Sequence, residues 1–114
     1  MGMDAYVIGF GRYRKEIREH LDYPTEFYDD VKEGTPIVTT LFWCYTSDTS
    51  RNLATVLGCV PWDFNTHRLD VSGIKPDDLL TYDGLEGMDN LERSVENFKA
   101  LRNAGFRFHY MPNG

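Results

Sequence analysis

The sequence predicts an α/β fold in which a small sheet of three or four strands packs against helices. Segments with strand character alternate along the chain with segments of helical spacing, and this alternation is typical of an α/β layer. A helical pattern separates the first two strands, so we expect them to run parallel through a right-handed crossover. A length of 114 residues suits one domain, and we expect residues 1–114 to form it.

The first predicted strand covers residues 5–10, and a helix is expected soon after it. Tyr13, Ile17 and Leu21 recur at every fourth residue, which places them on one face of a helix. Pro24 should end this helix. The helix would then form the crossover between the first two strands.

Two glycines flank the end of this strand. Gly9 and Gly11 supply two of the three glycines of a dinucleotide-binding fingerprint. Arg14 stands where the third glycine is required, so the fingerprint is incomplete. A tight turn between the strand and the helix is the preferred interpretation.

Residues 37–45 form the predicted central strand. The segment is rich in β-branched and aromatic residues, which suit a pleated surface. Its apolar side chains occupy both alternating positions, and such a strand is usually covered on both faces. The helical spacing of Leu53, Val56 and Leu57 follows, and Gly58 is a typical helix end.

The C-terminal third contains the clearest helical period. It predicts a long helix that ends at Gly105, and Asp89 with Glu92 resembles a capping box at its start. Residues 106–111 alternate between apolar and polar, which predicts a final strand near a sheet edge. Before the long helix, Pro76 suits the first turn of a short helix. The periodic residues are Met88, Leu91, Val95, Phe98 and Leu101.

Composition limits the class of protein. The chain has 18 acidic and 12 basic residues and a net charge of −6, so phosphate backbones repel it and we expect no nucleic-acid binding. No run reaches the roughly 18 apolar residues of a membrane helix, so we expect no membrane insertion. The two cysteines form no scaffold pattern and no secretory signal is evident, which favours a cytoplasmic protein. The oligomeric state is left open.

One functional site is expected at the junction between the central strand and the next helix. Ligands of open α/β sheets bind beyond the carboxyl ends of the strands, and free N–H groups at a helix start attract anions. Capping of the helix by one of the local hydroxyl groups is the alternative. The predicted site for an anion or small molecule consists of Thr46, Ser47, Thr49, Ser50 and Arg51.

Cys44 lies beside this junction and is a candidate nucleophile. A helix N-terminus stabilises a thiolate, and His67 or His109 would act as the base. In the alternative interpretation Cys44 is a small apolar residue of the core. The enzyme hypothesis therefore depends on the distance between Cys44 and either histidine.

Two further segments have the composition of a protein-binding surface. Trp62, Asp63 and Phe64 combine large rings with a carboxylate in a predicted loop, as recognition sites often do, although the rings could equally fill the core. Residues 70–92 contain seven acids and one base, Lys75, which creates a negative field. The acidic residues predicted to contact a partner are Asp77, Asp78 and Asp83.

Together these features favour a small acidic binding protein of the inhibitor or immunity type, with a basic protein as its partner. The alternative is an anion or small-molecule site at residues 44–51, with Cys44 in a catalytic role. No complete catalytic motif is present, so the sequence does not decide whether the chain is an enzyme. No histidines or cysteines have the spacing of metal ligands, so we expect no metal and no other cofactor.

Overall fold

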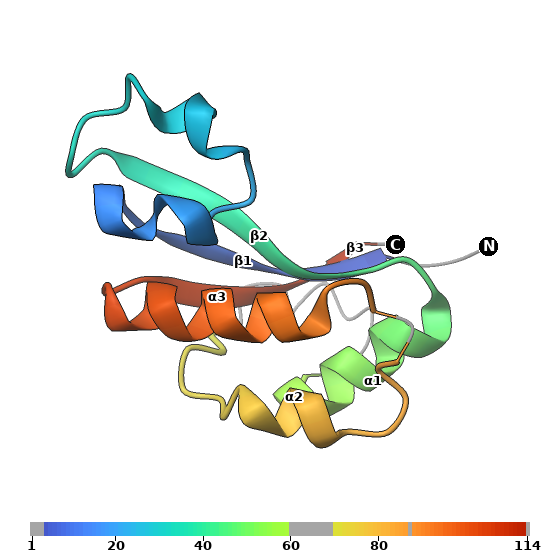
Figure 1. Ribbon diagram of the computed structural model, residues 1–114. Helices are drawn as coiled ribbons and strands as arrows, with labels where there is room; N and C mark the ends of the chain where they lie inside the picture. The colour runs from blue at the N-terminus through green and yellow to red at the C-terminus, as the bar shows by residue number, and fades with distance from the viewer. Residues whose placement is uncertain (1–3, 60–69, 87, 114) are drawn as a thin grey trace.

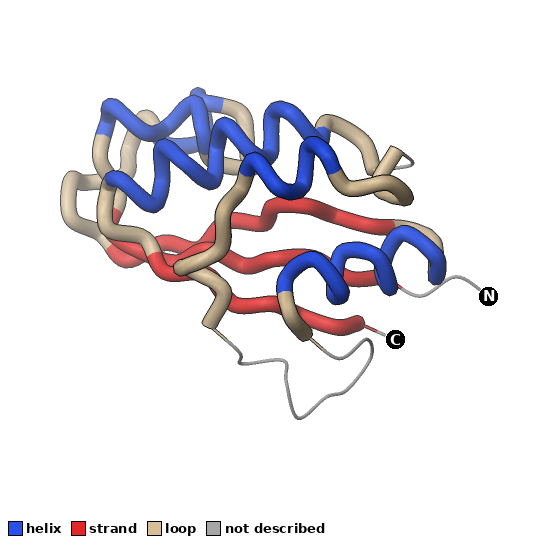
Figure 2. Tube along the Cα trace, turned by 90° about the horizontal axis from the view of Figure 1, so that it is seen from below, coloured by secondary structure: helices blue, strands red, loops and turns tan. Residues whose placement is uncertain are grey.

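The computed structural model describes residues 4–59, 70–86 and 88–113. Within these ranges three strands form one sheet: β1 (Asp4–Arg12), β2 (Pro36–Cys44) and β3 (Arg107–Asn113). The strand order is β2-β1-β3, and both neighbouring pairs are antiparallel. Figure 2 shows the three strands side by side.

Helices cover one face of the sheet. The helices α1 (Ser47–Leu57), α2 (Asp77–Thr81) and α3 (Leu91–Asn103) lie below the sheet in Figure 1. Two 3-10 helices, η1 (Lys15–His20) and η2 (Thr25–Tyr28), belong to the connection between β1 and β2. Of these, η2 projects on the side of the sheet opposite α3 (Figure 1).

The prediction that the first two strands run parallel is wrong. Tyr13 N–H donates to the Thr35 carbonyl at 2.8 Å and Gly34 N–H donates to the Tyr13 carbonyl at 2.8 Å, so the chain returns at the end of the sheet that it left. A parallel crossover must run back along the nine residues of β1, a distance of about 30 Å. The six residues of η1 rise only about 12 Å. The spacing of Tyr13, Ile17 and Leu21 reflects their burial in the core.

β2 is an edge strand, although its composition predicted a central one. Ala5 pairs with Cys44 and Val7 pairs with Leu41, so β2 has one residue more than β1 between these pairs. At this β-bulge Phe42 has a φ of 55°, and its side chain is buried like that of its neighbour Leu41. Two consecutive apolar residues therefore enter the core, which removes the expected alternation.

β1 is the central strand, and its two glycines lie inside it. A Cβ atom at Gly11 would lie 2.5 Å from the ring of Phe106, and one at Gly9 would lie 2.8 Å from the ring of Phe108. Both rings are buried, so they have little room to move. The glycines allow these rings to approach the central strand, and the predicted tight turn is wrong because the strand continues to Arg12.

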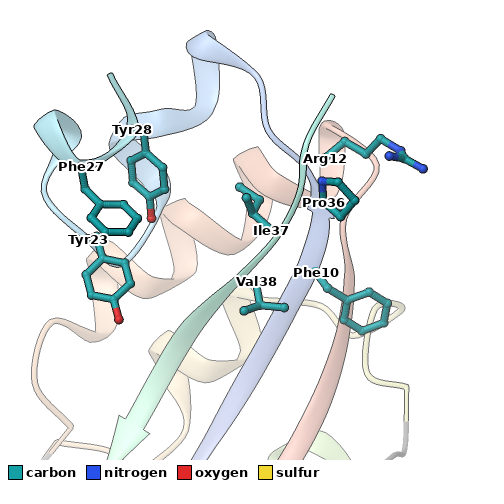
Figure 3. Close-up of a pocket in the computed structure, with 9 residues that line it drawn as sticks. Phe10, Arg12, Tyr23, Phe27, Tyr28, Pro36, Ile37 and Val38 are labelled. Carbon is teal, nitrogen blue, oxygen red and sulfur yellow. The ribbon is translucent and has the colours of Figure 1, made fainter. Parts of the chain in front are cut away.

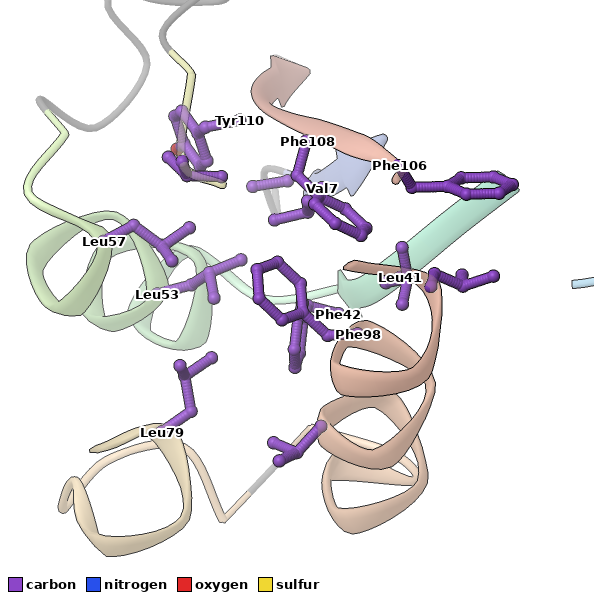
Figure 4. Close-up of a cluster of buried hydrophobic side chains, with 14 of the residues drawn as sticks. Val7, Leu41, Phe42, Leu53, Leu57, Leu79, Phe98, Phe106, Phe108 and Tyr110 are labelled. Carbon is purple, nitrogen blue, oxygen red and sulfur yellow. The ribbon is translucent and has the colours of Figure 1, made fainter. Parts of the chain in front are cut away.

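The core fills the space between the sheet and the helices (Figure 4). Phe98 of α3 lies at its centre, with its ring centroid 4.2 Å from that of Phe108 and 6.1 Å from that of Phe42. Leu53 of α1 and Leu79 of α2 belong to the same buried cluster. All three strands and all three α-helices thus contribute to one apolar layer.

The start of α3 differs from the prediction. The helix begins at Leu91 after Asn90, which has a φ of 56° and makes no side-chain capping bond. Asparagine visits this left-handed region more readily than most residues. The capping box expected from Asp89 and Glu92 is therefore not the device that starts the helix.

A short segment covers the outer edge of β3. Asp70 forms an isolated β-bridge with His109, and Phe108 N–H donates to Ser72 Oγ at 2.8 Å. Burial raises the pKa of the Asp70 carboxyl, but hydrogen bonds from Ser72 and from Arg107 outweigh it and lower the pKa to about 2. Asp70 is therefore ionised above this pH and ties the segment to β3.

The close approach at Gly11 leads to a stability prediction. We expect Gly11→Ala to lower the free energy of unfolding by about 1–3 kcal/mol, because the added methyl group overlaps the buried Phe106 ring. Urea unfolding measures the change. Gly73→Ala is the matched control, since a Cβ there meets nothing within 4 Å, and it should change stability by less than about 0.5 kcal/mol. Equal effects of the two substitutions would contradict the packing argument.

Candidate functional site

At the junction after β2, the hydroxyl group of Thr46 caps the helix that follows. Thr46 is the N-cap residue of α1, and its Oγ1 accepts a hydrogen bond from Thr49 N–H at 3.2 Å. Thr49 and Ser50 are buried. Asp48 places a carboxylate in the first turn, 3.8 Å from Arg51 Nη1. The helix start therefore already has a hydroxyl cap and a negative charge.

Cys44 is fully buried at the end of β2. Its Sγ donates to the Phe42 carbonyl at 3.6 Å, and it belongs to the same buried apolar cluster as Leu53 and Ala54 of α1. A nucleophile must be reached by its substrate, and this thiol faces the core. The structure thus places Cys44 beside the predicted anion site but not on its surface.

The second thiol is also enclosed. Cys59 follows α1 directly and is buried, and burial raises the pKa of its thiol to about 11. At neutral pH Cys59 is therefore protonated and weakly nucleophilic. Neither cysteine is in a disulfide bond.

Several predicted site residues lie outside the described part of the chain. These are the candidate base His67 and the predicted recognition residues Trp62, Asp63 and Phe64. The other candidate base, His109, lies in β3, where its ring makes an edge contact with that of Phe10 at 5.0 Å.

The predicted acidic surface is exposed. Asp77 and Asp78 open α2 and Asp83 follows its end, and all three are exposed. Asp77 forms an ion pair with Lys99 of α3 at 2.6 Å. The carboxylates bracket Leu80, whose side chain is 43% exposed.

A hollow of about 540 Å³ opens between the end of α2 and the start of α3, and none of these three carboxylates lines it. Its apolar lining includes Leu80, Leu85 and Met88, and its charged lining includes Glu86 and Arg93. Hydrogen bonds from the backbone N–H groups of Glu86 itself and of Gly84 lower the pKa of the Glu86 carboxyl. This carboxylate therefore stays ionised at neutral pH.

A second hollow, which we call the aromatic groove, lies where β2 begins. It also measures about 540 Å³, and its nine lining residues come from β1, β2 and the segment around η2. Its exposed apolar side chains are Phe10 (36%), Tyr23 (56%), Phe27 (61%) and Val38 (61%). These are four of the six large apolar side chains exposed on the described part of the molecule. Exposed apolar residues that are scattered singly are normal on a protein surface, whereas these four are clustered.

Stacked rings build one wall of the groove (Figure 3). The rings of Tyr23 and Phe27 stack with centroids 4.7 Å apart, and the Phe27 ring meets that of Tyr28 edge-on at 5.1 Å. Tyr28 is buried against Tyr13, at 5.6 Å between ring centroids. Burial raises the pKa of the Tyr28 phenol, and the charge of Asp22 adds to this, so the hydroxyl remains protonated at neutral pH.

The wall is fixed to the sheet by the segment that precedes η2. Asp22 N–H donates to Thr39 Oγ1 at 2.9 Å, and the Asp22 carboxylate accepts from Thr40 N–H at 3.0 Å. These two bonds hold the start of the wall against the outer edge of β2. The groove is therefore a preformed feature, which reduces the entropy lost on binding.

The groove was not among the sites predicted from the sequence. Tyr23, Phe27 and Tyr28 form an aromatic cluster within the acid-rich residues 22–33, and that contrast is the signal that points to them. The assumed parallel crossover hid their relation to β2. In an antiparallel pair this connection begins and ends at one edge, which brings the rings to Val38.

The chain matches no protein-family model, and comparisons with curated proteins and with solved structures found no match. Across the described ranges, no three histidine, cysteine, aspartate or glutamate side chains converge as metal ligands. No helix in those ranges is both long enough and apolar enough to cross a bilayer. The functional argument therefore rests on the two hollows and the charges around them.

The burial of both thiols predicts slow chemical modification. In the native protein we expect Cys44 and Cys59 to react with iodoacetamide far more slowly than in denaturant, even near the usual thiol pKa of about 8.5. Peptide mapping by mass spectrometry distinguishes the two sites. Fast modification of native Cys44, slowed by phosphate, would instead support a reactive thiol at an anion site.

Proposed function

We propose that this chain is a small acidic binding protein that recognises a basic protein, in the manner of an inhibitor or immunity protein. The observation that carries the proposal is the surface of α2 and the start of α3, where Asp77, Asp78 and Asp83 are exposed. A hollow on this part of the molecule has leucine and methionine side chains and the carboxylates of Glu86 and Glu92 in its lining. A net charge of −6 favours association with a positively charged surface.

The hollow suits a lysine or arginine side chain of the partner. Leu80 and Met88 offer apolar contact to the aliphatic stem, and a carboxylate such as Glu86 can receive the charged head group. Arginine is also among the residues that most often dominate binding energy. Arg93 lines the hollow too, but its Nη2 donates to the Glu19 carbonyl at 2.9 Å, so part of its guanidinium is already bound.

The proposed setting is the cytoplasm. Cys44 and Cys59 are buried and neither is in a disulfide bond, which suits a reducing compartment. Nucleic acid is a poor partner for the acidic surface because phosphate would be repelled. The partner is therefore proposed to be a protein.

Charge reversal tests the proposal. We expect Asp78→Lys with Asp83→Lys to weaken binding of the basic partner by about tenfold or more, because two carboxylates that would face cations become repulsive. The partner is first captured from cells that make this protein and then purified. Titration calorimetry at low and high salt measures the affinity, which should fall with salt.

The control is Glu16→Lys with Glu19→Lys, which changes the net charge equally on η1. Both glutamates are exposed, so the control should fold and keep most of its affinity. The proposal fails if no purified basic protein binds. It also fails if both double variants lose the same affinity, because net charge alone would then explain the effect.

A further inference from the structure

The aromatic groove is a second concave surface, separate from the carboxylates of α2. It lies at the edge of the sheet beside η2, and Figure 1 shows η2 on the side of the sheet opposite α3. Figure 3 shows Tyr23 and Phe27 on one side of the groove and Val38 of β2 across from them, with Phe10 beyond. No residue of the α2 surface lines it.

The backbone of β2 at Val38 faces away from its neighbour β1. Hydrogen bonding alternates along an antiparallel pair, and Tyr13 N–H donates toward β2, to the Thr35 carbonyl. With the observed register, the N–H groups of Ile37 and every second residue after it therefore point toward β1. Thr40 confirms the alternation, because its N–H donates outward to Asp22.

Val38 is therefore an unfilled position of the sheet edge. Among the described residues, no hydrogen bond is found to its N–H or to its carbonyl. The two neighbouring residues that face outward cannot donate a backbone hydrogen bond to a guest. Pro36 has no N–H group, and the N–H group of Thr40 already donates to Asp22. The N–H group of Val38 and the adjacent outward-facing carbonyl groups are thus exposed directly beside the aromatic wall.

We propose that the aromatic groove binds a short extended segment of a partner protein, which pairs with β2 at Val38. Addition of a strand to an open edge supplies backbone hydrogen bonds, and pockets for alternate side chains supply specificity. Here one apolar side chain of the guest enters between Phe10 and Phe27. A volume of about 540 Å³ suits a short segment.

Charge favours a guest with lysine or arginine next to its apolar residue. Glu26 and Asp30 flank the aromatic wall and are exposed, and within the described ranges no cation pairs with either of them. The nearby acids Asp29 and Glu33 already pair with η1 or its cap residue. Arg12 also lines the groove, but its Nη1 donates to the Gly34 carbonyl at 3.0 Å and Figure 3 shows the guanidinium pointing away from the rings.

A displayed library of random short peptides is the probe. Selection on the wild-type protein should enrich extended sequences that carry apolar residues beside lysine or arginine. Synthetic versions of the enriched peptides should bind Phe27→Ala about tenfold or more weakly, since the principal aromatic contact is lost. Binding should also shift the amide resonance of Val38, because a guest that pairs with β2 forms a hydrogen bond to this N–H group. A guest that only contacts the rings would form no such bond.

Tyr45→Ala is the matched control, because Tyr45 is 57% exposed against 61% for Phe27 and lies outside the groove. It should leave peptide affinity unchanged. The double substitution Glu26→Lys with Asp30→Lys should weaken the binding of the basic peptides but not the binding of their neutral analogues. Peptides that bind Phe27→Ala equally well, or a library with no enriched binder, would overturn the proposal.

A second copy of the chain is the competing occupant. Sedimentation would then show a dimer that Phe27→Ala dissociates, and that result also overturns the proposal. This inference uses none of the α2 carboxylates, so its outcome and that of the charge-reversal test are independent.

Discussion

The fold depends on how closely two aromatic rings approach the central strand. β1 bonds to both other strands, so a displacement of β1 would disturb every strand of the sheet. Gly9 and Gly11 let the rings of Phe108 and Phe106 lie against its backbone, and Phe98 of α3 then packs on Phe108. Because interiors are close-packed, this contact sets the distance between the sheet and α3.

The long connection between β1 and β2 builds the aromatic wall of the groove on this sheet. Two 3-10 helices are too short to bury a full face, so the segment instead stacks its rings on one another and on Tyr13. Arg14 and Arg18 pair with Glu33 and Asp29 at 3.8 Å and 3.5 Å, although exposed pairs of this kind contribute little stability. The firmer attachment is that of Asp22 to β2, through its own N–H and its carboxylate.

The sequence predicted where most helices and strands lie, because those signals are local. The period of α3 and the glycine after α1 needed no knowledge of distant contacts. Strand order and strand direction depend on contacts between distant residues. The consecutive apolar residues Leu41 and Phe42 suggested a strand buried on both faces, but a bulge turns both side chains toward the same core. The exposure of Asp78 could be predicted from its charge. The groove could not be predicted, because Tyr23 lies near Val38 only when β1 and β2 pair antiparallel, and the periodicity of the sequence does not reveal that pairing.

An open strand edge normally invites association with further copies of a protein, and β2 limits that hazard residue by residue. Pro36 offers no N–H, Asp22 occupies the N–H of Thr40, and Ser94 Oγ accepts from Phe42 N–H at 3.4 Å. The edge that remains at Val38 is too short for a long strand of another copy to pair along it. It is long enough for a short guest whose side chain gains the burial that the aromatic wall provides, so selectivity at this edge comes from the rings rather than from the backbone.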